Sequence, residues 1–309
     1  MNTATLSRSG REYLALRRAL GFKLTNETWY LPAFVGFLAK RRSTVITREL
    51  ALSWAQQDAD ASPNTWAKRL SVVRGFANYM RTLDPRTAVL PPDLAPWHAQ
   101  RPTPHIYTEQ EVAKLMRATQ RIRPPSLRVT FLTLIGLLAA TGMRLGEALA
   151  LEDDDVNWDG AVLTVRCTKF QKTRLVPVHA STLAALQHYR RSRDRNFPNR
   201  RSPTFFVSSV GRRLHRRVVE MTFVLLLRRA GIDLRPARRP RLHDLRHTFA
   251  VRTLRDWYRA GVDVEQRLPA LSTYLGHVNP STTYWYLTAT PELVAAAGKR
   301  LSRAWEVRP

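Results

Sequence analysis

The chain has 309 residues, enough for two domains of ordinary size, and its 44% hydrophobic and 24% charged residues are typical of a folded protein. Its 50 Lys and Arg against 24 Asp and Glu give a net charge of +26, which favours nucleic acid as a partner over an anionic membrane surface. No segment approaches the ~18 apolar residues of a membrane-spanning helix, and the single cysteine, Cys167, excludes an internal disulfide. We therefore expect a cytoplasmic protein that binds nucleic acid and is not inserted in a membrane.

The first part of the chain predicts a small helical domain. Apolar residues recur at helical spacing from Tyr13 to Phe76. Ser62-Pro63-Asn64 predicts the end of one helix and the start of the next. Six prolines between residues 84 and 105 have the composition of a linker. We predict a helical domain at residues 1–90 and a linker at 91–106.

The remainder, residues 107–309, predicts a larger domain that is mainly α with a small β-hairpin, an α+β fold. Thr108 and Glu111 have the spacing of a capping box at a helix start. An apolar helix at about 127–140 ends at Thr141-Gly142. Val162-Thr164-Arg166 and Arg174-Val176-Val178 alternate with the period of a hairpin. The other segments predicted to be helical are 181–193, 215–230, 243–260, 264–275, 280–288 and 291–304.

Positive charge is concentrated in the second domain. Residues 1–106 carry a net +8 and residues 107–309 a net +18. Between 190 and 241 there are 16 basic and only 3 acidic residues. A solvated arginine-rich surface usually carries acidic partners, and this segment mostly lacks them. It therefore predicts a surface that faces DNA.

Cleavage of a phosphodiester needs cations where negative charge accumulates, and an acid for the leaving oxygen. Metals are one source of cations. His243 and His247 have the i, i+4 spacing of zinc ligands, but Arg246 lies beside them and no third ligand is evident. Asp153–Asp155 has the composition of a two-metal carboxylate cluster, but a solvated loop is the simpler interpretation. We expect no metal and no other cofactor.

Arginine is the other source, because its planar fork donates to two phosphate oxygens at once. Arg144 follows the Thr141-Gly142 turn at a helix start, where free N–H groups favour an anion. Arg246 shares a helix face with His243. His277 follows a helix that should end at Gly276, and Asn279-Pro280 should open the next one.

Two tyrosines, Tyr284 and Tyr286, lie in that last helix. Residues two apart on a helix point about 200° apart, so only one of them can face the site. Spacing alone does not say which.

Three motifs together resemble a known family. ATGMRLGEALAL (140–151), LHDLRHTFA (242–250) and LGHVNPSTTYWYL (275–287) are similar, in order and spacing, to the signature boxes of the tyrosine recombinases, or phage integrases. The resemblance extends from about Tyr107 to the C-terminus. It implies a catalytic domain there and a DNA-clamping core-binding domain before the linker.

The resemblance also implies roles for the motif residues. Arg144 and Arg246 would clamp the scissile phosphate. His243 and His277 would donate hydrogen bonds to it or help to manage the tyrosine proton. Tyr286, nine positions after His277, would be the nucleophile.

Supporting roles follow from the same resemblance. Tyr284 would be a packing residue beside Trp285, and Glu147 would orient an arginine. Lys169, on the hairpin turn, would be the general acid for the 5′ oxygen. Lys172 is the alternative acid, because this turn lacks the glycines that usually flank the lysine.

The expected activity is site-specific DNA recombination through a 3′-phosphotyrosyl intermediate, for integration, transposition or resolution of a replicon. Expected partners are double-stranded DNA and further copies of the chain, a monomer or weak dimer in solution and a homo-tetramer on two DNA sites. The alternatives are a type IB topoisomerase and a DNA-binding regulator without catalysis.

Overall fold

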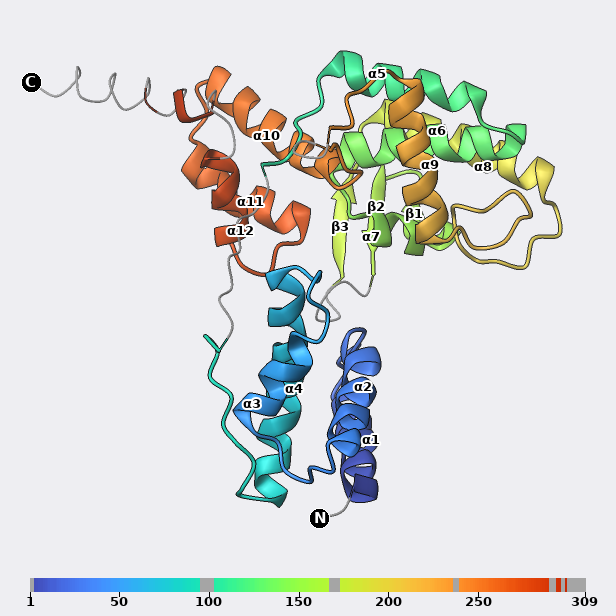
Figure 1. The fold of residues 1–309 in the computed structure, drawn as a ribbon. Coiled ribbons are helices and arrows are strands. Elements are labelled where there is room, and N and C mark those ends of the chain that lie inside the picture. Colours follow the sequence, from blue (N-terminus) through green and yellow to red (C-terminus); the bar gives the residue numbers. More distant parts are fainter. Residues whose placement is uncertain are drawn as a thin grey trace, which may run out of the picture. The chain divides into compact units, whose positions relative to one another are not determined.

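A computed structural model describes residues 3–94, 103–166, 173–235, 239–288, 293–295 and 298 of the chain (Figure 1). The chain divides into two compact units, residues 1–101 and 102–309, and the division falls in the proline-rich segment. In the part of the chain that is described, none of the helices combines the length and the apolarity that a bilayer crossing needs.

The described part of the first unit, residues 3–94, contains four helices. They are α1 (Thr3–Ala19), α2 (Glu27–Lys40), α3 (Arg48–Ala55) and α4 (Pro63–Leu83). The Ser62 side chain accepts a hydrogen bond from the backbone N–H of Thr65, and Pro63 is the first helical residue, which confirms the predicted helix start. Phe34, Trp54 and Phe76 are buried in the core between the helices.

The beginning of the predicted linker belongs to this first unit. The Arg74 guanidinium donates hydrogen bonds to the carbonyl oxygens of Leu90, Pro91 and Pro92 at 2.9–3.1 Å. Leu90 itself is buried in the core of the unit. Residues 91 and 92 are therefore tied to α4 and do not form a free connection.

The second unit combines helices with one small antiparallel sheet of strand order β1-β2-β3. Thr108 and Glu111 form the predicted capping box, with both reciprocal hydrogen bonds present. Its helices are α5 (Glu109–Ala118), α6 (Pro125–Thr141), α7 (Leu145–Ala150), α8 (Ala180–Asn196), α9 (Arg216–Arg229), α10 (Asp244–Arg259), α11 (Val264–Leu275) and α12 (Ser281–Tyr284), with the 3₁₀ turns η1 (Thr119–Arg121), η2 (Asp153–Asp155) and η5 (Trp285–Thr288).

The predicted hairpin is confirmed as β2 (Val162–Val165) paired with β3 (Arg174–Pro177). A third strand, β1 (Val156–Asn157), pairs with β2 and was not predicted, because two residues are too few to show a period. The helix expected at 291–304 lies largely outside the described residues.

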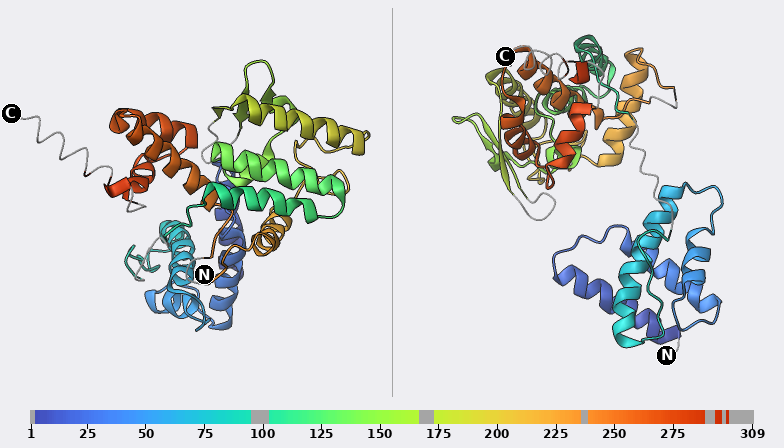
Figure 2. Two further views of the ribbon diagram at one scale, coloured as in Figure 1. Left: turned by 90° about the horizontal axis from the view of Figure 1, so that it is seen from above. Right: turned by 90° about the vertical axis from the view of Figure 1, so that its left-hand side faces the viewer.

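Two hydrophobic cores organise the second unit. One lies between the sheet and α5, α6, α8 and α9, and the other is formed by α10, α11 and η5. Helix α10 packs against both α6 and α11 (Figure 2). It therefore brings the end of α6 and the end of α11 close to one another.

Gly142 makes that approach possible. It ends α6 with a left-handed φ of 61°, as the Thr-Gly turn predicted. A Cβ atom here would lie 2.7 Å from the Phe249 ring of α10 and 3.2 Å from Leu275 of α11. Only glycine therefore satisfies both the backbone conformation and the close packing.

Replacing Gly142 with Ala should destabilise the second unit by about 1–3 kcal/mol, because strain and overlap act together. Urea unfolding measures the change. The matched control is Gly146→Ala in α7, where a Cβ would meet nothing within 4 Å and helix propensity favours alanine. Equal stability of the two variants would contradict this account of Gly142.

Candidate active site at the end of helix α11

Three arginines from distant segments donate hydrogen bonds to successive carbonyl oxygens at the end of α11. Arg174 Nε lies 2.9 Å from Tyr274 O, Arg246 Nη2 lies 2.6 Å from Leu275 O, and Arg144 Nη2 lies 2.9 Å from Gly276 O. Arg144 Nη1 also reaches Leu275 O at 3.5 Å. The guanidinium groups of Arg144 and Arg246 therefore converge on one atom.

Glu147 joins two of these arginines. Its carboxylate accepts two hydrogen bonds from Arg174, at 3.0 and 2.8 Å, and one from Arg144 Nη1 at 2.8 Å. It also accepts a hydrogen bond from the backbone N–H of Arg144, which lies three residues earlier in the chain. Burial raises the pKa of the Glu147 carboxyl, but the hydrogen bonds and charges of Arg174 and Arg144 outweigh burial and lower the pKa to about 2.

Arg246 is the most enclosed of the three. It is only 2% exposed, and Nη1 donates to Gly142 O at 2.8 Å, across the junction of α6 and α10. Burial and then the charge of Arg144 lower its pKa to about 10. The guanidinium is still charged at neutral pH, and it is held against another cation.

The histidines of the site are neutral at neutral pH. Burial, followed by the charge of Arg246, lowers the pKa of His243 to about 4. Burial and then the charges of Arg246 and Arg144 lower the pKa of His277 to about 3. His277 lies after Gly276, whose φ of 69° ends α11 as predicted, and its Nδ1 lies 2.7 Å from the Thr283 hydroxyl.

Tyr284 and Tyr286 differ in solvent exposure, as expected for two residues that point to opposite sides of a helix. Tyr286 is 2% exposed, and its hydroxyl lies 3.1 Å from His247 Nδ1, with its ring beside that of His277. Tyr284 is 49% exposed. The expectation that Tyr284 is a packing residue is therefore wrong, because its side chain lies on the outer face of this short helix.

The acidic loop is engaged by arginines. Asp153 accepts hydrogen bonds from Arg193, with Nη1 at 2.7 Å, and pairs with Arg200, while Asp155 pairs with Arg166. Within the described ranges, no group of three or more His, Cys, Asp and Glu has the arrangement of a metal site. The Arg193 side chain is fully buried, so part of the arginine-rich segment 190–241 serves the core and does not face outward.

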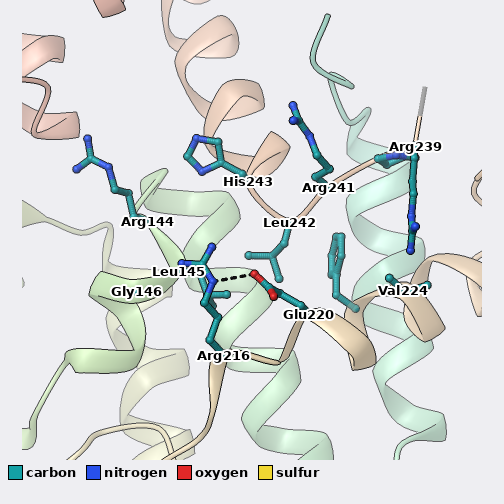
Figure 3. A pocket seen from close by; sticks show the side chains of 12 residues that line it. Arg144, Leu145, Gly146, Arg216, Glu220, Val224, Arg239, Arg241, Leu242 and His243 are labelled. Carbon is teal, nitrogen blue, oxygen red and sulfur yellow. Dashed lines mark hydrogen bonds and ion pairs between the residues drawn. The ribbon is translucent and has the colours of Figure 1, made fainter. Parts of the chain in front are cut away.

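A pocket of about 570 Å³ adjoins the candidate site (Figure 3). Arg144 and His243 line one part of it. Arg216, Arg239 and Arg241 line another part, together with Glu220, which pairs with Arg216. Its apolar wall is formed by Leu145, Phe223, Val224 and Leu242. The pocket therefore continues the positive potential of the site toward α9.

Comparison with known proteins assigns the chain. Residues 106–292 match the phage integrase family. The chain belongs to this family. It is 44% identical over 312 residues to the putative integrase/recombinase y4rB of Sinorhizobium fredii, with 99% of each chain covered. The recombinase therefore catalyses DNA strand exchange as a tyrosine recombinase.

Solved structures share its fold. The XerH site-specific recombinase bound to palindromic difH substrate, a post-cleavage complex, matches with a TM-score of 0.66 at 19% identity, over 90% of this chain and 78% of that one. A lambda integrase tetramer bound to a Holliday junction matches with a TM-score of 0.60 at 17% identity, over 89% and 78%.

The site of the recombinase brings together six of the residues singled out in the sequence. They are Arg144, Glu147, His243, Arg246, His277 and Tyr286. Lys169 and its alternative Lys172 lie outside the described residues. The sequence analysis did not include Arg174 in the site. Arg174 and the buried Val176 alternate in the strand, so both side chains lie on the same face of it. An arginine on a buried face needs a carboxylate partner, which is Glu147.

Replacing Glu147 with Gln should destabilise the recombinase by about 3 kcal/mol at neutral pH, because the enclosed Arg174 and the partly exposed Arg144 lose their counter-charge. Since folding lowers the Glu147 pKa from 4.5 to about 2, its contribution is complete above 4.5 and is lost as the pH falls toward 2. Urea unfolding over this pH range measures the difference between the two proteins.

The matched control is Glu220→Gln, which removes the exposed Arg216–Glu220 pair of α9. It should change the free energy of unfolding by less than about 0.5 kcal/mol. Similar losses in both variants would show that Glu147 does not join the arginines in solution.

Proposed function

We propose that the recombinase cuts DNA by attack of Tyr286 on a phosphodiester held by Arg144 and Arg246. The observation that carries this proposal is the convergence of these two guanidinium groups on Leu275 O, beside an enclosed tyrosine. Two cations held close together repel each other. A bound anion offsets this repulsion, which is already present in the free protein. A phosphate oxygen pair is the anion that guanidinium groups bind best.

Neutral His243 and His277 complete the proposed phosphate site. A neutral imidazole donates a hydrogen bond from one ring nitrogen without adding a third repelling charge. Donors fixed where charge develops stabilise the pentacoordinate transition state without reorganising. Glu147 and Arg174 act on these groups indirectly, because they fix the position of Arg144.

The proposed reaction exchanges one phosphate ester for another. The Tyr286 oxygen bonds to phosphorus, the bond from phosphorus to the 5′ oxygen breaks, and the enzyme keeps the 3′-phosphate. A 5′-hydroxyl of a second DNA strand then reverses the step. The XerH site-specific recombinase was solved as a post-cleavage complex with its difH substrate, which supports cleavage as one step of the proposed reaction.

Tyr286→Phe should abolish the covalent protein–DNA adduct and leave DNA affinity almost unchanged, because only the attacking oxygen is removed. Adduct formation on a substrate nicked beside the cleavage position, followed by denaturing electrophoresis, measures this. Tyr284→Phe is the matched control and should remain active, since its side chain is exposed.

An adduct with Tyr286→Phe protein would refute the assignment of the nucleophile. Absence of any adduct with the unchanged protein would instead favour a DNA-binding regulator. Relaxation of supercoiled plasmids that lack a recombination site would favour a type IB topoisomerase.

We also propose Lys169 as the acid that protonates the leaving 5′ oxygen. Its loss should be largely repaired by a 5′-phosphorothiolate substrate, whose sulfur leaves without a proton. Cleavage rates of Lys169→Ala and Lys172→Ala on both substrates test this role. Repair of Lys172→Ala alone would move the role to that residue.

For assembly, we propose that the two units grip duplex DNA together and that four copies act on two sites. Both units are basic, with net charges of +8 before residue 107 and +18 after it, and a linker between two binding units raises the effective concentration of the second contact. The tetrameric state of the lambda integrase relative supports the copy number.

Deletion of residues 291–309 should impair synapsis and cleavage more than binding to a single site. Sedimentation of the free protein, and native electrophoresis with one or two DNA sites, measure these steps separately. Recombination at the normal rate by the truncated protein would refute a role of this segment in assembly.

A further inference from the structure

The second histidine of the LHDLRHTFA motif contacts the buried tyrosine. His247 Nδ1 lies 3.1 Å from the Tyr286 hydroxyl oxygen, and the two ring centroids are 5.5 Å apart. His277 Nδ1 instead lies beside the Thr283 hydroxyl, at 2.7 Å. The His243 ring meets the His247 ring edge-on, with a centroid separation of 4.8 Å.

We propose that His247 is a catalytic residue whose Nδ1 accepts the proton that leaves Tyr286 when the tyrosine attacks DNA. The inference rests on the proposed function, in which Tyr286 is the nucleophile. His247 was considered in the sequence analysis only as a zinc ligand paired with His243, and the present proposal gives it a role in proton transfer. The proton acceptor must lie within hydrogen-bond reach of the proton, and His247 meets that requirement.

Enclosure makes a protein base necessary. Tyr286 is 2% exposed, so bulk water has little access to its hydroxyl. The Trp285 ring lies against His247, with centroids 5.5 Å apart, and covers the contact from the side of η5. Helix α10 and η5 pack together, which holds the imidazole and the phenol in place.

The surroundings of His247 keep its imidazole in the neutral form, which is the form that can accept a proton. Burial and then the neighbouring His243 lower the His247 pKa to about 4, so the imidazole is neutral across the physiological range. A phosphodiester bound at Arg144 and Arg246 adds negative charge, which raises the pKa of the imidazole and helps it hold the proton. Among the described residues, the charged and titratable groups near the pair include Arg144, Arg174, Arg241, His243, Asp244, Arg246 and His277.

The step balances without a further reactant. The Tyr286 O–H proton passes to Nδ1 of the neutral imidazole, whose other nitrogen carries its hydrogen. The phenolic oxygen bonds to phosphorus, and the bond from phosphorus to the 5′ oxygen breaks. The leaving oxygen takes its proton from the acid proposed above, and the reverse step returns the His247 proton to Tyr286.

The variant His247→Asn tests whether His247 takes the proton of Tyr286 or only holds the tyrosine in position. The asparagine amide can occupy the place of Nδ1 and hydrogen-bond the hydroxyl, but it is not a base. Single-turnover cleavage of a nicked 5′-phosphorothiolate substrate should be followed from about pH 6 to about pH 9.5, because this substrate removes leaving-group protonation from the profile. DNA affinity and thermal unfolding of the variant establish that it is folded.

The unchanged protein should show a nearly flat rate profile in this range. His247→Asn should be slower by about 10²–10⁴-fold at the low end, the usual contribution of a general base. Its rate should rise about tenfold per pH unit, because phenolate then forms only by loss of the proton to solvent. The two profiles should therefore converge at high pH.

His247→Ala provides a second test that does not depend on the asparagine variant. Added imidazole should restore cleavage in proportion to the concentration of its neutral form, since it fills the space of the lost base. A His247→Asn rate that equals that of the unchanged protein, or is lower by the same factor at every pH, would overturn the proposal. Either result leaves the nucleophile assignment intact, because that assignment fails only if Tyr286→Phe still forms the adduct.

Discussion

The last carbonyl groups of α11 are the constraint on which the arrangement of the site depends. A helix leaves its final carbonyl oxygens without intrahelical partners, and a buried one must find a donor elsewhere. Here the donors are guanidinium groups from the N-cap of α7, from β3 and from α10, and cations are also favoured at the negative end of a helix dipole. Meeting this local requirement brings residues that are 29, 100 and 132 positions away in the chain to the same helix end.

The same arrangement leaves the site short of negative charge. Glu147 accepts hydrogen bonds from Arg144 and Arg174, whereas the described contacts of Arg246 are with the backbone carbonyls of Gly142 and Leu275. The deficit is visible in the lowered pKa values of Arg246, His243 and His277, where burial comes first and arginine charges follow. A site of this kind gives up some stability in the free protein and gains affinity for an anion, as functional sites often do.

Local signals in the sequence were sufficient for most of the fold. The Thr108–Glu111 capping box, the Ser62-Pro63 helix start and the glycine ends at Gly142 and Gly276 each depend on neighbouring residues alone. Interactions between distant residues were not accessible in this way. The loop of Asp153–Asp155 was expected to be solvated, but Asp153 pairs with the buried Arg193, and Arg174 proved to be the partner of Glu147.

The sequence by itself determined the family and the limits of most helices, because motif order and capping chemistry are properties of short segments. It also established that only one of Tyr284 and Tyr286 can face the site. The tertiary structure decided which tyrosine is enclosed, which histidine contacts it, and which carbonyls receive the arginines. These outcomes depend on how α10 packs between α6 and α11. This packing brings together residues that are far apart in the chain, and no local sequence pattern shows that they are in contact.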